Sequence, residues 1–450
     1  MKLKYKRTIA ILLCLIMTLG MLAGCSGSGG TSSDSGSNSG TETSDDAWFT
    51  PALDTETART IKVIGNYDNF EALDAAALAF REFYPNVEIV YEKMDDYNEN
   101  LTTRLQNDSE VGIFMINRYN FLYDDALIDC TADISKTGVD LTAIDQDAVD
   151  GCYIDGKLFG IPLWFRYYGM VVNKNLFEAE GLEIPTKLDE FYAVCDKLLA
   201  DGYVPLQQDI NMMGCLLKNK TMNIVANMSD EEVAALIRGD EGSAAALKPS
   251  YEMMLEMIGK GYISAASMAE YEDSYDAAIL KFYEGETPIL VASTQTVSGM
   301  AKRESRSEAF TANPFEYEFI YAPYGETGAM LYKADDTGFG LNANCSYYDM
   351  AEEFYRFIYT EKILNQFSQI KGAPSTAANP DNDLYGDLSQ ISDENMSNFS
   401  DFKDPTSRIN DVDVKVCDAI LKGEITDADA ATALFEKIAS EMESGTYSEE

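Results

Sequence analysis

A set of polar and aromatic side chains stands at the ends of predicted strands and in the turns that follow them. Amides, carboxylates and guanidinium groups make bidentate hydrogen bonds, and flat rings cover the apolar face of a small molecule. A single aromatic residue more often fills a core than lines a cleft, so the position of these residues after strands carries the prediction. The candidate binding residues are Asn66, Tyr67, Asp68, Asn117, Arg118, Tyr119, Trp164, Arg166, Tyr167 and Gln295.

Arg118 also has a plainer explanation. Its guanidinium group suits vicinal hydroxyls and carboxylates equally well. The chain contains 76 acidic residues, and Arg118 could simply pair with one of those nearby. From the residues alone, a role in ligand binding and a role as one half of an ion pair are both open.

Catalysis by histidine is excluded, because the sequence contains no histidine. Its absence removes serine–histidine and cysteine–histidine nucleophiles, imidazole bases, and the usual zinc and haem ligand sets. Carboxylates, tyrosine, cysteine or lysine would have to perform any chemistry, and nothing in the sequence singles out a pair of carboxylates. We therefore predict no catalytic residue, no metal site and no cofactor.

The first candidate residues need a sheet to position them. Residues 60–65 alternate as a strand, an amphipathic helix follows, and residues 85–91 supply the next strand. A buried strand over residues 111–116 precedes Asn117 after a second helix. Ligands bind at the carboxyl ends of strands in sheets of this kind, so the loop 66–69 is predicted to form part of a cleft wall.

A polar turn and a proline mark the strand that precedes Trp164, Arg166 and Tyr167. A polar turn at residue 155 leads into a strand that should end at Pro162, because proline cannot donate to a central sheet. The aromatic and cationic cluster follows directly. Further on, Thr186 is predicted as the N-cap of a helix whose first turn is acidic.

The N-terminus predicts export and anchoring. Basic residues precede an apolar stretch, residues 9–21, that is too short to span a membrane. The following Leu-Ala-Gly-Cys resembles the lipobox of bacterial lipoproteins, which predicts lipidation of Cys25. Residues 26–46 are rich in Ser, Gly, Thr, Asn and Asp and predict a flexible tether to the outer side of the cell membrane. An ordinary signal peptide with a chance cysteine is the alternative.

Length and charge limit the other possibilities. A chain of 450 residues is too long for one compact core and suits two lobes. The 34 basic residues face 76 acidic ones, a formal charge of −42, so nucleic acid would be repelled. No two cysteines form a Cys-x-x-Cys pair, and for the six beyond Cys25 both disulfides and buried thiols are open.

The central passage carries a family resemblance. It is similar to the segment by which sugar-type extracellular solute-binding proteins of ABC importers, the maltose-binding-protein-like proteins, pass from their first lobe to their second. Val172 stands where that family usually has tyrosine. The matching residues are Gly156-Lys157-Leu158-Phe159-Gly160-Ile161-Pro162, Asn173-Lys174-Asn175-Leu176-Phe177, Gly181-Leu182, Pro185-Thr186 and Asp189-Glu190.

The resemblance implies an α/β, two-lobed periplasmic-binding-protein-like fold, with discontinuous lobes joined by a hinge of three crossings. It also implies a monomer that captures a sugar or oligosaccharide in an interlobe cleft and delivers it to ABC permease subunits in the membrane. Trp164 and Arg166, in the hinge, would contribute to ligand contact and to closure. The expected divisions are a signal peptide over 1–24, a tether over 25–55, a first lobe over 56–163 with 337–372, and a second lobe over 168–330 with 376–446.

Two other classes of function are open. A carboxylate-dependent glycoside hydrolase needs no histidine and would cleave an oligosaccharide incubated with it. A surface adhesin or peptide-binding lipoprotein would show no saturable response to sugars.

The predicted loop 292–296, which holds Gln295, resembles a cleft loop in which relatives frequently carry a tryptophan, and this sequence has none there.

Overall fold

A computed structural model describes residues 48–117, 125–269, 271, 274–381, 384–385, 388–399 and 406–447. The chain divides into Met1–Ala47 and a body, Trp48–Glu450, and the described residues all belong to the body. In these ranges no helix combines the length and the apolar character needed to cross a membrane.

The first sheet has five strands in the order β2-β1-β3-β12-β6. Strand β1 runs parallel to β2 and β3, whereas β12 runs antiparallel to β3 and β6. Parallel pairs need crossover connections, which α2 and α3 supply. The predicted elements between residues 60 and 116 are confirmed within two residues at each end. The bounds are β1 (Arg59–Gly65), α2 (Glu71–Phe80), β2 (Val87–Lys93), α3 (Tyr97–Asn107), β3 (Val111–Ile116), β6 (Ile161–Pro162) and β12 (Gly338–Leu341).

Shorter elements and the two helices that follow β12 complete the first lobe. The passage predicted as one strand ending at Pro162 holds two short strands, with Gly160 between them. A Cβ at Gly160 would lie 2.9 Å from the carbonyl oxygen of Phe339, so only glycine lets the neighbouring strand approach. The elements that complete the first lobe are α4 (Asp125–Cys130), η1 (Ile134–Lys136), η2 (Leu141–Ala143), α5 (Gln146–Asp150), β4 (Tyr153–Ile154), β5 (Lys157–Leu158), α16 (Tyr348–Ile358) and α17 (Glu361–Lys371).

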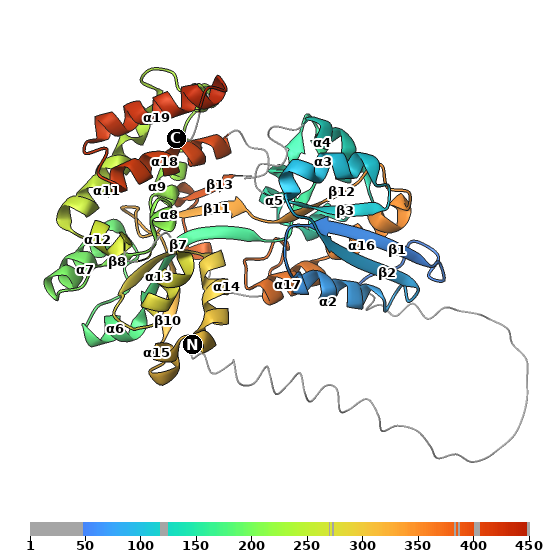
Figure 1. Ribbon diagram of the computed structural model, residues 1–450, viewed down its shortest axis with the longest axis horizontal. Helices are drawn as coiled ribbons and strands as arrows, with labels where there is room; N and C mark the ends of the chain where they lie inside the picture. Colours follow the sequence, from blue (N-terminus) through green and yellow to red (C-terminus); the bar gives the residue numbers. More distant parts are fainter. Residues whose placement is uncertain are drawn as a thin grey trace, which may run out of the picture. The chain divides into compact units, whose positions relative to one another are not determined.

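Helices cover both faces of the first sheet. Helix α2 buries Ala72, Leu73, Ala76 and Phe80, a stripe at helical spacing. Strand β3 is buried along its whole length, as expected for a strand covered on both sides. Figure 1 shows α2 and α17 on one side of this sheet and α3 and α4 on the other.

The second sheet is organised around β7, its longest strand. The order is β13-β11-β7-β9-β8, and β10 also pairs with β7. Tyr168 of β7 lies opposite Ser293 of β9, and Tyr167 lies opposite Lys333 of β11. The strands are β7 (Phe165–Asn173), β8 (Leu206–Gln207), β9 (Ile289–Ser293), β10 (Tyr317–Tyr321), β11 (Leu331–Asp335) and β13 (Met396–Phe399).

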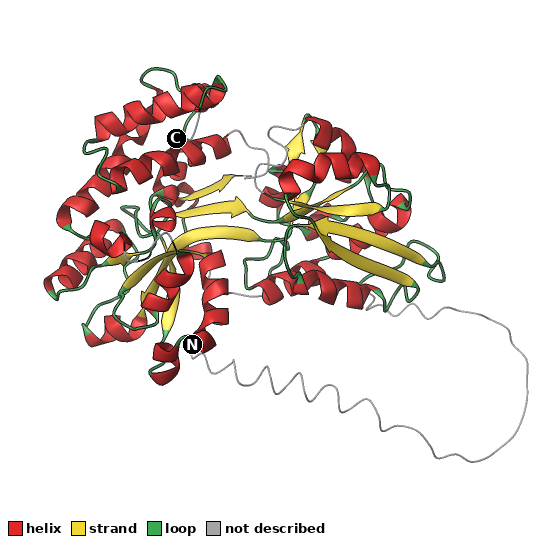
Figure 2. Ribbon diagram, viewed as in Figure 1, coloured by secondary structure: helices red, strands yellow, loops and turns green. Residues whose placement is uncertain are grey.

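Helices surround this sheet and form a second core. Met253, Met254 and Met257 of α11 are buried in it. Figure 2 shows the strands of the body enclosed by helices. The helices are α6 (Lys174–Ala179), α7 (Leu188–Ala200), α8 (Ile210–Met213), α9 (Lys218–Ala226), α10 (Asp230–Arg238), η3 (Ser243–Leu247), α11 (Lys248–Lys260), α12 (Ala265–Ala269), α13 (Tyr275–Phe282), α14 (Thr294–Arg303), η4 (Glu304–Arg306), α15 (Glu308–Ala312), η5 (Leu388–Gln390), η6 (Asp393–Asn395), α18 (Thr406–Leu421) and α19 (Ala428–Glu443).

Three crossings join the two lobes, as predicted. The chain passes from β6 to β7, from β11 to β12, and from α17 back toward the second sheet. The crossings bond to one another: the N–H of Leu163 donates to the carbonyl of Thr337 at 2.7 Å, and the N–H of Phe165 donates to the carbonyl of Pro374 at 2.9 Å. Trp164 and Ser375 form an antiparallel bridge. The first crossing therefore holds both of the others in register.

Two local predictions are wrong. Lys187, not Thr186, is the N-cap of α7, and Thr186 instead donates from both its N–H and its hydroxyl to Glu190 Oε2 at 3.0 Å. The segment expected as the loop 292–296 begins helix α14 immediately after β9. There the hydroxyl of Thr296 accepts from the N–H of Ser293 at 3.1 Å, which starts the helix without a loop.

The described part of the chain contains six cysteines. All six cysteines in the described part of the body are free thiols, and five of them are buried. This settles the open choice between disulfides and thiols. No group of three or more Cys, Asp or Glu side chains that could hold a metal ion occurs among the residues the structure describes.

A capping box at the start of α10 predicts a measurable effect. Ser229 Oγ donates to Glu232 Oε2 at 2.7 Å, and the N–H of Ser229 donates to the same oxygen at 2.8 Å. Ser229→Ala should lower the free energy of unfolding by about 1 kcal/mol, measured by urea denaturation. Ser440→Ala, on the exposed face of α19 away from its cap, is the control. Equal stability of the two variants would contradict the prediction.

Candidate functional site

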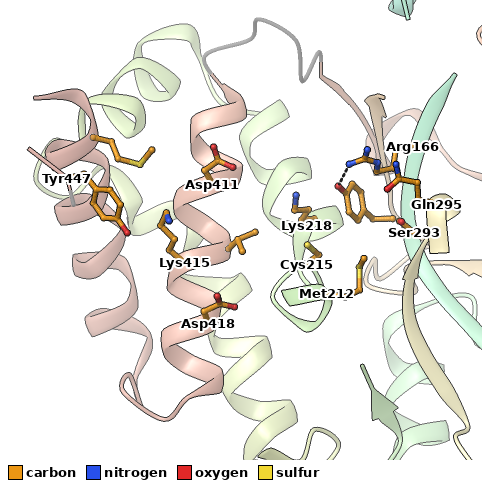
Figure 3. A pocket seen from close by; sticks show the side chains of 13 residues that line it. Arg166, Met212, Cys215, Lys218, Ser293, Gln295, Asp411, Lys415, Asp418 and Tyr447 are labelled. Carbon is orange, nitrogen blue, oxygen red and sulfur yellow. Dashed lines mark hydrogen bonds between the residues drawn. The ribbon is translucent and has the colours of Figure 1, made fainter. Parts of the chain in front are cut away.

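A pocket of about 700 Å³ opens beside β7 in the second lobe. Its volume falls in the range of small-molecule sites, about 300–1,000 Å³. Figure 3 shows the side chains of α18 facing those of residues 212–218, with Arg166 and Gln295 at one end and Tyr447 at the other. The lining residues are Arg166, Tyr168, Met212, Cys215, Lys218, Ser293, Gln295, Asp411, Val414, Lys415, Asp418, Met442 and Tyr447.

Arg166 is held in position at one end of the pocket. Strand periodicity directs Arg166 and Tyr168 to the same face of β7. The Nη1 of Arg166 lies 3.5 Å from the hydroxyl of Tyr168, the bond drawn in Figure 3. Its Nη2 donates to Asp336 Oδ1 at 2.5 Å, and Gln295 Nε2 donates to Asp336 Oδ2 at 3.2 Å. One carboxylate in the crossing therefore orients both the guanidinium and the amide.

The Arg166–Asp336 pair is mostly shielded from solvent. Only 17% of the Arg166 side chain and 7% of the Asp336 side chain are exposed. Removing one partner of such a pair leaves the other charge buried and poorly compensated. The pair thus fixes the pocket end and also links β7 of the second sheet to the crossing that follows β11.

Helix α18 forms a second wall. Asp411, Val414, Lys415 and Asp418 recur at intervals of three and four residues, which places them on one face of the helix. The ammonium of Lys415 lies 5.0 Å from the centre of the Tyr447 ring. Charges of both signs therefore alternate along this wall beside an aromatic end.

Lys218 stands on the opposite wall and is only 1% exposed. Its ammonium lies 4.7 Å from the centre of the Tyr168 ring, a favourable cation–π arrangement. Because Tyr168 also contacts Arg166, two cations are arranged around one aromatic side chain. The buried ammonium thus fixes the position of the ring at the pocket surface.

Asp413 lies behind the α18 wall and is fully buried. Burial raises the pKa of Asp413 from its ordinary 3.8 to about 6, and the hydrogen bonds and the charge of Lys218 offset only part of this effect. The hydroxyl of Tyr251 donates to Asp413 Oδ1 at 3.1 Å, and that of Thr221 donates at 3.4 Å. At neutral pH this carboxylate is ionised at the expense of stability.

A second polar cluster surrounds Lys371, the last residue of α17. Its ammonium lies 4.6 Å from the centre of the Tyr67 ring and 5.3 Å from that of the Trp164 ring. The hydroxyls of Tyr67 and Thr337 are hydrogen-bonded at 2.7 Å. Burial raises the pKa of Tyr67 and lowers the pKa of Lys371. Thr337 directly follows Asp336, which bonds to Arg166, so this cluster adjoins the Arg166 end of the pocket.

Of the residues predicted from the sequence, the structure brings Arg166 and Gln295 together in the pocket. Tyr67 and Trp164 meet around the ammonium of Lys371 instead. The Trp164 ring is fully buried and lies against Phe367, with centroids 6.5 Å apart. In this conformation Trp164 supports the crossing from inside, and its predicted contact with a ligand stays a prediction.

The other predicted residues lie elsewhere. Tyr167 is buried. Asn66 lines a separate pocket of about 420 Å³ beside the end of β2. Asp68 is 89% exposed and pairs with Lys93 at 2.6 Å. Asn117 follows β3 and is half-buried. Arg118 and Tyr119 lie outside the described residues.

The prediction missed the residues that complete the site. Asp336 immediately precedes residue 337, where the first lobe was expected to resume, and Lys371 immediately precedes residue 372, where that segment was expected to end. A charged residue next to a predicted crossing was the available signal for both. Lys218 and Tyr168 gave no such signal, because a lysine in a helical region and a tyrosine in an aromatic run fit a structural role equally well.

The arrangement suits binding more than reaction. A fixed guanidinium, an amide, hydroxyls and aromatic rings offer directed hydrogen bonds and flat apolar faces. In the described residues these groups surround an elongated space with charges of both signs. Such a lining suits a polar molecule of small-ligand size.

Several solved structures share this fold. The binding protein RafE in complex with raffinose is 15% identical, with 85% of this chain and 99% of that chain covered and a TM-score of 0.63. The GacH receptor of Streptomyces glaucescens, solved unliganded and with acarbose, is 15% identical, with coverages of 87% and 100% and a TM-score of 0.65. The binding protein MsmE of Bacillus subtilis, in an open conformation, is 14% identical, with coverages of 88% and 100% and a TM-score of 0.65.

The sequence comparisons differ in what they return. No curated protein matches this chain. The family model described as bacterial extracellular solute-binding protein matches residues 65–363, which is more than half of the chain. This span includes Arg166, Gln295 and Asp336. The protein therefore belongs to the bacterial extracellular solute-binding protein family, whose members are binding proteins and not enzymes.

Proposed function

We propose that this protein is the membrane-anchored binding component of an ABC importer, which captures a sugar or oligosaccharide and delivers it to permease subunits. The observation that carries the proposal is the pocket in which Asp336 orients both Arg166 and Gln295 at a crossing between the lobes. The similar structures with raffinose and with acarbose support a saccharide as the ligand class.

The chemistry of the pocket fits a polyol. Vicinal hydroxyls accept from a guanidinium fork and an amide, while an apolar sugar face needs an aromatic partner. Arg166 and Gln295 are the proposed hydrogen-bonding contacts, and Tyr168 and Tyr447 are the proposed aromatic contacts. Closure about the three crossings would give the permease a bound state that differs from the open one.

A thermal-shift screen followed by calorimetry tests the ligand class. Mono- and oligosaccharides should include at least one that raises the melting temperature in a saturable manner, because a ligand at 100 times its Kd stabilises the folded state by about 2.7 kcal/mol. The oligosaccharide should be recovered intact after incubation. No saturable shift with any saccharide, or appearance of cleavage products, would contradict the proposal.

Cys25→Ser tests the anchor in the native bacterium. The wild-type protein should fractionate with membranes, and the variant should not, because its sulfur carries the proposed acyl chains. Cys14→Ser, which changes a cysteine of the same leader outside the proposed lipobox, is the control and should stay with membranes. Membrane association of Cys25→Ser equal to the wild type would contradict lipidation at this residue.

A further inference from the structure

Two aromatic rings from different parts of the chain lie close to the ammonium of Lys371. The group lies over the Tyr67 and Trp164 rings, one from the loop after β1 and one from the first crossing. Rings of this kind stabilise a cation but do not neutralise it. Within the described ranges, no acidic side chain lies within the 4.0 Å that defines an ion pair with Lys371.

Lys371 is one of three cations that lie near two carboxylates. Arg166 and Lys302 repel its ammonium, while Asp336 and Glu71 attract it. Both carboxylate oxygens of Asp336 are already engaged, one by Arg166 and one by Gln295. No carboxylate of the described residues therefore pairs directly with the ammonium of Lys371.

Burial makes the positive charge costly. The pKa of Lys371 is lowered, chiefly because the ammonium has lost much of its hydration. An incoming anion would restore a counter-charge in a partly dry environment, where it is worth more than in water. The Tyr67 ring beside this ammonium carries a hydroxyl that is hydrogen-bonded to Thr337, the residue after Asp336, so Lys371 adjoins the pocket end that Arg166 and Asp336 form.

We propose that Lys371 recognises a carboxylate on the bound ligand, so that the protein selects an acidic saccharide, such as a uronic acid or a short oligosaccharide containing one, over its neutral counterpart. The inference rests on the proposed function and specifies the substrate class of the same site. Tyr67 and Trp164 act here as positioning residues, because their rings hold the ammonium at the crossing.

Calorimetry with matched ligands tests this inference on the mature body. Galacturonate is compared with galactose, glucuronate with glucose, and short oligomers of galacturonate with galacto-oligosaccharides of equal length. The wild type should bind the acidic member of at least one pair ten-fold or more tightly, and added salt should reduce that ratio. Lys371→Met should bind the acidic and the neutral member equally well. Its affinity for the neutral member should stay within about three-fold of the wild-type value, since only the carboxylate contact is lost.

Two variants separate this role from a general effect of charge or stability. Lys302→Met removes an exposed positive charge that also acts on Lys371, and it should keep the preference for the acid. Lys371→Arg keeps the charge and should retain most of the preference, even if Lys371→Met folds poorly.

The binding measurements distinguish failure of the inference about Lys371 from failure of the proposed function. Tight binding of neutral saccharides with no gain from a carboxylate would overturn the inference and leave the proposed function intact. An acid preference that survives in Lys371→Met would also overturn it. Failure of acidic and neutral saccharides alike to bind would overturn both.

Discussion

Arg166→Met should weaken binding of the saccharide ligand by about 100-fold, measured as Kd by calorimetry. The guanidinium group supplies the fixed donor at the pocket end, and the loss of two charged hydrogen bonds is worth about 2.7 kcal/mol. The same change should lower the free energy of unfolding by about 2 kcal/mol, because Asp336 would keep only its bond from Gln295 in a mostly buried position.

Two further variants separate the effects on binding and stability. Arg303 pairs with Asp276 between α14 and α13 and is exposed to a similar extent, but it does not line the pocket. Arg303→Met should therefore cost stability without changing Kd. The double variant Arg166→Met with Asp336→Asn should recover much of the stability and none of the affinity. An unchanged Kd in Arg166→Met would remove this residue from the binding site.

Asp413→Asn should change how stability depends on pH. The pKa of the carboxyl group rises from 3.8 to about 6 on folding. Below the lower value it is protonated in both states and has no effect. Between the two values the unfolded chain releases the proton first, so native stability falls as pH rises, and above pH 6 the full loss persists. Over this range the free energy of unfolding of the wild type should fall by about 3 kcal/mol, and that of Asp413→Asn should not show this loss.

Urea denaturation at pH values from 3.5 to 7.5 measures this effect. The unfolding free energies of wild type and Asp413→Asn should diverge up to about pH 6 and then run parallel. Asp74→Asn, on the exposed side of α2, is the matched control and should follow the wild type within about 0.5 kcal/mol. If the Asp413→Asn and wild-type curves run parallel over the whole range, the buried carboxyl does not titrate as described.

The fold was largely predictable because its signals are local. Alternation in residues 60–65, the apolar spacing in α2 and the proline at residue 162 each depend on short stretches of chain. The misplaced start of α7 shows the limit of such signals. Thr186 and Lys187 are adjacent, and the helix begins at Lys187 because its carbonyl accepts the first helical hydrogen bond, from the N–H of Phe191 at 3.0 Å.

The site was less predictable because distant segments build it. Asp336 meets Arg166 across 170 residues of sequence, and α18 supplies a wall from a region that was predicted only as part of the second lobe. No local pattern encodes such pairings. Trp164 illustrates the converse case, since its place in the crossing was predicted but its burial against Phe367 depends on packing from α17.

Fold membership alone does not name a ligand, since specificity lies in individual side chains. The central claim is that the ligand is a saccharide bound at the Arg166 end of the 700 Å³ pocket. A crystal structure of the protein with the saccharide found by screening tests it most directly. The account predicts hydroxyl oxygens of the sugar within hydrogen-bonding distance of Arg166 and Gln295. A saccharide bound in the pocket beside Asn66, with the Arg166 pocket empty, would contradict it.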